Sequence, residues 1–426
     1  MSSATLTLPP CLNPQAQQPR PRGAKRRKAK SLARRCKAFM MRHTWVLPLA
    51  VCCVVAGAYL LNPTPSNPVH QALFLSYPLP RDADAPADAP TMYGKGAKDF
   101  YFVAYYVAFL TFTREFLMQR MLRPLAVRCG IRKGGKQTRF VEQVYTAIYF
   151  AVFGPFGMYV MSQTPVWYFN TRAMYENFPH REHDGLFKTY YLLQASYWAQ
   201  QAIVLLLQQE KPRKDYKELV GHHIITLALI WLSYRFHFAS MGLAVYITHD
   251  ISDFFLATSK TLNYLDSPLI GPYYAFFVVV WTYLRHYINL RILWSILTEF
   301  NTVGPYELNW DTQQYKCWIS QIITFGLLAS LQAINLFWLF LILRIGYRFV
   351  TANVAVDERS DAEDDDEEQE EHRHQHQQRK EDGAADGLLK QHQPDILVNG
   401  EPVEAGGKEA AATGVQTRSK VRSRKA

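Results

Sequence analysis

Long uncharged runs alternate with short charged stretches along most of this chain. The uncharged runs cover residues 44–80, 143–171, 189–209, 219–234, 267–284 and 317–343. A helix rises about 1.5 Å per residue and a bilayer core is about 30 Å thick, so a spanning helix needs about 20 apolar residues. Five of the six runs reach or nearly reach that length. The pattern therefore excludes an ordinary soluble globular protein.

Two further spans are predicted where charges interrupt the apolar pattern. Residues 98–119 hold an uncharged stretch between Asp99 and Arg114, which can span if its charged ends lie at the interfaces. Residues 239–259 place ionisable side chains inside the span. The predicted fold class is all-α, a polytopic membrane protein with about eight transmembrane helices.

The averages of the whole chain conceal unlike parts. The 426 residues carry a formal net charge of +11, and the mean hydropathy is -0.15. Residues 1–42 contribute +11, residues 351–426 contribute -7, and the body between them contributes +7. We predict a basic disordered cytosolic arm over 1–43 and an acidic disordered cytosolic tail over 351–426.

The tails suggest solvated or regulatory roles. Next to a membrane span, the basic arm is expected to meet anionic lipid or to fix orientation, and no nucleic acid partner is expected. In the tail, Ser360 precedes Asp361 and Glu363, a context that suits an acidophilic kinase. An unmodified, solvated tail is an equally good interpretation.

Loop charges predict the orientation. Residues 120–139 carry seven Lys or Arg and no acid, and residues 210–218 carry Lys211, Arg213, Lys214 and Lys217. Because cytosolic loops hold the positive excess, both termini are expected in the cytosol. The first anchor is then expected at 44–61, followed by a lumenal segment at 62–97. The six cysteines offer no lumenal disulfide pair and no CxxC spacing for zinc.

Ionisable side chains concentrate in the predicted hairpin of residues 215–260, where each costs about 3 kcal/mol or more inside a membrane. Helical rise places His222 and His223 about 6 to 8 Å below the cytosolic face. Asp253 is expected about 10 Å below that face and His249 about 16 Å below it. Because these helices must be neighbours, the histidines and carboxylates are expected to face each other.

The second helix of this hairpin carries its ionisable groups at helical spacing. His249, Asp250 and Asp253 lie three and four residues apart, which places side chains on one face. A carboxylate beside an imidazole raises its basicity, as a general base or a nucleophile requires. A structural polar network is the alternative, including an ion pair of Asp250 with Arg285 or Arg291.

The next span adds three cationic or titratable residues, Arg285, His286 and Arg291. Arg285 is expected about 24 Å from the cytosolic end, near the lumenal face, where its side chain would reach the interface. These three residues are therefore left out of the predicted catalytic set.

The stretch from Asp215 to Tyr264 resembles the Lag1 motif of the TLC-domain ceramide synthases. The residues that carry the resemblance are His222, His223, Thr226, Ser233, Tyr234, Gly242, His249, Asp250, Asp253 and Lys260. The resemblance extends over roughly residues 98–346, within a TLC domain placed at 98–350, and implies a helical barrel that encloses an intramembrane site. The basic arm and the acidic tail resemble the fungal branch.

The resemblance implies an N-acyltransferase of the endoplasmic reticulum membrane that moves a fatty acyl group from acyl-CoA to the amine of a sphingoid base. The implied catalytic residues are His222, His223, His249, Asp250 and Asp253. Either His222 or His223 deprotonates the amine, or one of them first takes the acyl group as an acyl-imidazole. Lys211, Arg213, Lys214 and Lys217 could contact the CoA phosphates, although the orientation rule alone also explains them.

No metal and no cofactor besides the co-substrate acyl-CoA are expected. The fungal resemblance also implies a small single-span accessory subunit and a dimer partner in the bilayer. Two rival functions are also compatible with the sequence: a transporter that uses the His and Asp groups as a proton relay, and a membrane di-iron lipid hydroxylase. The second would need many more histidine clusters than the single HxxH pair formed by His180 and His183.

Overall fold

The structure is a computed structural model, and it describes residues 38–40, 42–81, 86, 89–207 and 215–352. All of them belong to one compact unit, Met1–Asp361. Most of the predicted basic arm, nearly all of the acidic tail, Ser360, Lys211, Arg213 and Lys214 lie outside the described residues.

The described chain is almost entirely helical. The helices are α2 (Val46–Leu61), α3 (His70–Leu73), α4 (Asp99–Leu117), η1 (Met118–Leu122), α5 (Arg123–Arg128), α6 (Gly134–Ser162), η2 (Arg172–Met174), α7 (Gly185–Leu206), α8 (Tyr216–Arg235), α9 (Ala239–Tyr264), α10 (Ile270–Thr282), η3 (Tyr283–Ile288), α11 (Asn289–Thr298) and α12 (Trp318–Ala352). Two short strands, β1 (Met92–Tyr93) and β2 (His183–Asp184), pair in antiparallel register. The all-α prediction is confirmed.

A helix lies in each of the eight ranges expected to span a membrane, but the boundaries differ. α6 ends at Ser162 although the apolar run continues to residue 171, because Pro165 disfavours helical backbone just before it. Among the described helices, Gly134–Ser162 and Trp318–Thr351 are long and apolar enough to cross a bilayer by length and composition alone, and Val46–Leu61 is a shorter apolar helix. The number of spans thus stays a prediction.

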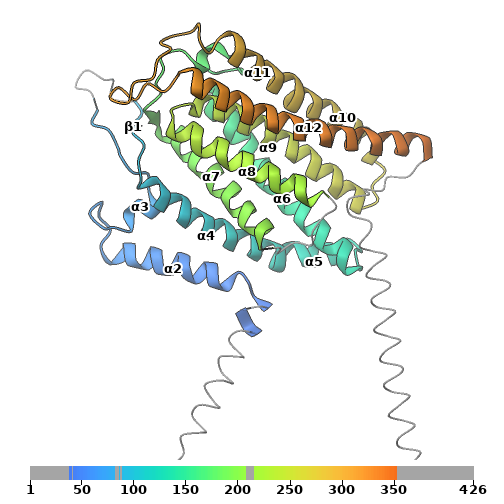
Figure 1. The fold of residues 1–426 in the computed structure, drawn as a ribbon. Helices are drawn as coiled ribbons and strands as arrows, with labels where there is room; N and C mark the ends of the chain where they lie inside the picture. Colours follow the sequence, from blue (N-terminus) through green and yellow to red (C-terminus); the bar gives the residue numbers. More distant parts are fainter. Residues whose placement is uncertain (1–37, 41, 82–85, 87–88, 208–214, 353–426) are drawn as a thin grey trace, which may run out of the picture. The chain divides into compact units, whose positions relative to one another are not determined.

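The helices pack most closely where a glycine lies at the contact. α6 packs along α9, and α4 lies between α2 and α7 (Figure 1). A Cβ at Gly157 of α6 would lie 2.5 Å from the Tyr190 hydroxyl and 2.9 Å from Ile247 Cγ1, so only glycine permits this approach. Gly242 of α9 likewise faces Tyr191 and Ser233 without room for a Cβ. These close contacts hold α6, α7, α8 and α9 around a shared core.

A buried ion pair ties the segment before α4 to the helices. The Lys188 ammonium, fully buried on α7, lies 2.8 Å from Asp99 Oδ1 and donates to the carbonyls of Ser76 and Gly94, each at 2.8 Å. Asp99 Oδ2 accepts a hydrogen bond from Tyr234 of α8 at 2.9 Å. Residues from four parts of the chain therefore depend on one charge pair.

Lys188→Met is expected to destabilise the protein by about 3 to 5 kcal/mol, because it leaves the Asp99 carboxylate and two carbonyls buried without their cation. Thermal unfolding in detergent measures the change. Arg172→Met is the matched control, since its pair with Glu176 is largely exposed and worth less than about 1 kcal/mol. Equal losses for the two variants would contradict the assigned role of Lys188.

His237, in the turn between α8 and α9, predicts acid sensitivity. Burial, with help from the positive charge of Lys95, lowers the pKa of His237 from its ordinary 6.5 to about 3. Between these values the unfolded chain binds more protons than the folded chain, so stability falls as pH drops from 6.5 toward 3. The melting temperature should fall less steeply over this range in His237→Gln than in the parent protein. Identical slopes would contradict this assignment.

Candidate active site

His222 is held in the interior of the bundle by α8. Its side chain is 4% exposed, and its ring lies against two indoles, with centroids 5.9 Å from Trp198 and 5.1 Å from Trp338. The Nε2 atom lies 3.5 Å from Thr226 Oγ1 one turn along α8, and Nδ1 has no hydrogen-bond partner among the described residues. His222 thus keeps a nitrogen available for chemistry.

Two cavities meet at His222. The apolar cavity has a volume of about 230 Å³ and is lined by side chains of α7, α8, α9 and α12 and of residues 308–317. The polar cavity has a volume of about 210 Å³ and is lined by side chains of α6 to α10, η3 and α12. His222 and Trp198 line both cavities. A buried imidazole therefore stands between a compartment suited to hydrocarbon and one suited to charge.

The two neighbours of His222 divide between the cavities. His249 lines the apolar cavity, and its ring centroid lies 6.5 Å from that of His222. His223 lines the polar cavity, and its Nδ1 lies 2.9 Å from the carbonyl of Leu219. The three histidines lie in one region, as the sequence predicted. The structure adds that each of them borders a different combination of the two cavities.

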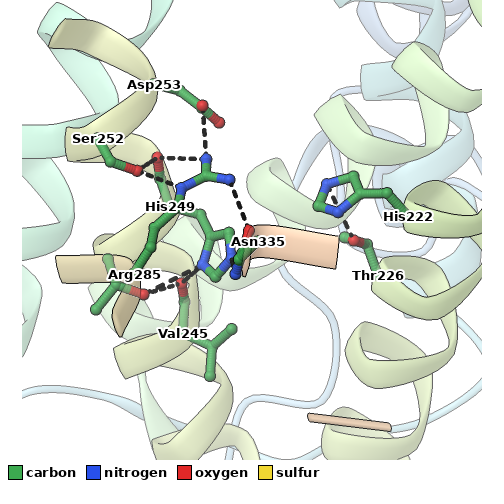
Figure 2. A network of polar contacts seen from close by, with 9 residues as sticks. His222, Thr226, Val245, His249, Ser252, Asp253, Arg285 and Asn335 are labelled. Carbon is green, nitrogen blue, oxygen red and sulfur yellow. Dashed lines mark hydrogen bonds and ion pairs between the residues drawn. The ribbon is translucent and has the colours of Figure 1, made fainter. Parts of the chain in front are cut away.

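Asp253 pairs with Arg285 and not with a histidine. Its Oδ1 lies 2.6 Å from Arg285 Nη2, the Arg285 side chain is 2% exposed, and its guanidinium stacks 4.0 Å above the Trp281 ring. Arg285 Nε also donates to Ser252 Oγ at 2.6 Å. Figure 2 shows the contacts of Arg285, on η3, with Asp253 and Ser252 of α9.

The expectation that the Arg285 side chain reaches the lumenal interface is wrong, because this side chain is buried beside Asp253. The helix α9 continues to Tyr264, one turn past Lys260, so Asp253 lies about 16 Å from its end and not about 10 Å. Arg285 lies about 22 Å from the start of α10 at Ile270, and its long side chain covers the remaining difference.

Asp250 faces away from the histidines. It accepts hydrogen bonds from Tyr190 at 2.8 Å and from Gln194, both on α7. Successive helix residues are about 100° apart, so His249 and Asp253 share a face while Asp250 points toward α7. Among the described residues, no hydrogen bond joins a carboxylate to His222 or His249. The expected carboxylate–imidazole contact is therefore corrected.

The polar cavity is lined by basic residues that were not predicted, and of the four predicted ones the structure describes only Lys217. Lys217 is exposed on α8 and does not line this cavity, whereas Arg139, Lys260 and Arg285 do. The same cavity also contains the acidic residues Glu142, Asp215 and Asp253. Across the described part of the chain, no three His, Cys, Asp or Glu side chains are placed to hold one metal ion.

Sequence reasoning missed Asn335, which contacts both His249 and Arg285. A usable signal was present, because Gln332 and Asn335 are amides three residues apart within the apolar run 317–343. That spacing puts both on one face of α12, where each is buried. Trp198 and Trp338 gave no such signal, since aromatic residues are common in every span.

Comparison with known proteins places these features in a family. The TLC domain family matches residues 139–344. Sphingosine N-acyltransferase-like protein FUM17 of Gibberella moniliformis is 52% identical over 327 residues, which cover 76% of this chain and 84% of that protein. Ceramide synthase LAG1 of Saccharomyces cerevisiae is 52% identical over 324 residues, which cover 76% of this chain and 77% of that protein.

A third relative, sphingosine N-acyltransferase lac1 of Schizosaccharomyces pombe, is 48% identical over 346 residues, which cover 80% of this chain and 88% of that protein. The resemblance expected from the histidine and aspartate motif is confirmed. The chain belongs to the TLC-domain family, among the fungal sphingosine N-acyltransferases and ceramide synthases.

Proposed function

We propose that this protein is an acyl-CoA-dependent ceramide synthase that transfers a fatty acyl chain to the amine of a sphingoid base. The observation that carries the proposal is the position of His222 between the apolar and polar cavities. Acyl-CoA has a long apolar chain and a polyanionic head, so its thioester would lie where two such compartments meet. The names of relatives about 50% identical support the same reaction.

The reaction breaks the thioester C–S bond, forms an amide C–N bond, moves a proton from the amine and releases the CoA thiol. His222 is the group we assign to this proton, because its Nδ1 is unpartnered and buried beside both cavities. In the direct route it accepts the amine proton as the acyl group transfers. In the two-step route its ring attacks the thioester and carries the acyl group as an acyl-imidazole.

The other predicted site residues take supporting roles in this proposal. His223 faces the polar cavity, where the CoA head would enter. Asp253 neutralises the buried Arg285 guanidinium, and Asp250 holds α7 against α9 through Tyr190 and Gln194. Lys217 on α8 and the preceding basic residues Lys211, Arg213 and Lys214 would then contact the CoA phosphates.

We further propose eight spans in the endoplasmic reticulum membrane, a helical barrel around the cavities and cytosolic termini. The loop charges support the orientation. Ionisable side chains on α7 and α9 would be costly in contact with lipid, but they are buried against other helices. Examples are Lys188, Asp250 and Asp253, the partner of Arg285. The exposed apolar residues Tyr287, Leu290 and Trp294 would face lipid, a single-span subunit or a second copy.

His222→Ala should lower the rate of ceramide formation by at least about a hundredfold, because the proton acceptor is lost. Detergent-solubilised protein, an acyl-CoA and sphinganine are incubated, and ceramide is quantified by mass spectrometry. His286→Ala is the matched control, since His286 is also buried but lines neither cavity. If the parent protein makes no ceramide, or His222→Ala keeps its rate while folded, the proposed function is wrong.

The two chemical routes differ when acyl-CoA is the sole substrate. The two-step route predicts a mass increase of one acyl group on the intact parent protein and none on His222→Ala. The direct route predicts no increase on either protein. Intact-mass spectrometry before and after addition of a sphingoid base separates the routes, since a true intermediate must disappear as ceramide forms.

A further inference from the structure

Asn335 joins the guanidinium of Arg285 to the imidazole of His249. It lies on α12, is fully buried, and accepts a hydrogen bond at Oδ1 from Arg285 Nη1 at 3.1 Å. Its Nδ2 lies 3.3 Å from His249 Nε2. Figure 2 shows the amide between these two groups, with His222 across the site.

The chemistry of these groups determines which atoms carry hydrogen. A guanidinium has only donors, so the oxygen of the Asn335 amide must face Arg285 and its NH2 must face His249. His249 Nε2 then accepts and carries no proton. The other ring nitrogen, Nδ1, lies 2.8 Å from the carbonyl of Val245 and 3.2 Å from Thr248 Oγ1. The carbonyl only accepts, and the Thr248 hydroxyl donates its hydrogen to that same carbonyl, so Nδ1 carries the proton. Both ends therefore indicate the same neutral tautomer.

We propose that Asn335 is a positioning residue that holds His249 neutral in its Nδ1–H tautomer, so that His222 is the one imidazole of the pair that gains charge during acyl transfer. The inference rests on the proposed function of His222. Two imidazolium rings 6.5 Å apart would repel each other in a site of low polarity. A neutral His249 removes that opposition to the charge that develops on His222.

The positive charge of Arg285 is neutralised within the same network of polar contacts. Asp253 pairs with the guanidinium at 2.6 Å, so Arg285 can orient Asn335 without presenting an uncompensated positive charge to the two rings. Arg285 Nη2 also lies 3.4 Å from the His249 carbonyl, and Nε donates to Ser252. The guanidinium is therefore held by Asp253, Ser252 and the His249 carbonyl. Because this donor is held in place, it determines which way the Asn335 amide oxygen points.

The chain contains a matched control on the same helix. Gln332 lies three residues before Asn335, is 4% exposed, and has its Nε2 2.7 Å from His286 Nδ1. Its Oε1 accepts from Asn289 Nδ2 at 2.7 Å. Gln332 thus joins a buried histidine to a second donor, as Asn335 does, but His286 lines neither cavity.

The direct test is the protonation state of His249. Protein labelled with nitrogen-15 in its histidine rings is studied by NMR in detergent, and the His249 signals are assigned by their loss in His249→Gln. The parent protein should show neutral His249 with the proton on Nδ1. An imidazolium, or a proton on Nε2, would overturn the proposal without any Asn335 variant being needed.

The kinetic test is Asn335→Asp, which replaces the NH2 donor by an acceptor of the same shape. His249 should become an imidazolium, and kcat should fall by about tenfold or more, since a charged His249 opposes the positive charge that develops on His222. The KM for acyl-CoA should stay within about twofold, because neither cavity is lined by Asn335. Gln332→Glu should keep the His249 signals and the kcat of the parent protein.

The outcomes separate the two proposals. If the parent protein makes ceramide and requires His222, but folded Asn335→Asp keeps its kcat, the role of Asn335 is wrong and the proposed function stands. An equal fall in kcat for Gln332→Glu and Asn335→Asp would show a structural effect of buried charge and would also overturn it. Failure of the parent protein to make ceramide rejects the proposed function.

Discussion

The ion pair between Arg285 and Asp253 joins η3 to α9 deep among apolar helices, and the polar groups of the site are arranged around it. A guanidinium removed from water needs an opposite charge and acceptors for its remaining donors. Asp253, Ser252, Asn335 and the His249 carbonyl supply them. The polar groups of the site thus satisfy the buried Arg285 guanidinium, and the orientation of His249 follows from its contacts with them.

This arrangement gives the histidines different tasks. Both ring nitrogens of His249 are occupied, by Asn335 and by the Val245 carbonyl, whereas Nδ1 of His222 has no partner within the described part of the chain. The imidazole best able to change its bonding is therefore the one that borders both cavities. Two neighbouring indoles confine it to that position.

Much of the fold was predictable because each long run of apolar residues indicates a helix in the same range. A helix lies in every expected range, and the motif in α8 and α9 predicted the region of the candidate site. The roles of Asp250, Asp253 and Arg285 were not predictable in the same way. Spacing along one helix shows which residues share a face, but not which neighbouring helix that face meets.

The sequence by itself determined the helical class, the segregation of charge to loops and tails, and the cluster of ionisable residues at 222–253. These properties depend on local composition and on helical periodicity. Only the tertiary structure decided that Asp253 binds Arg285, that Asp250 binds α7, and that Asn335 orients His249. Such pairings depend on the depth and rotation of separate helices, which are set by close packing at residues such as Gly157 and Gly242.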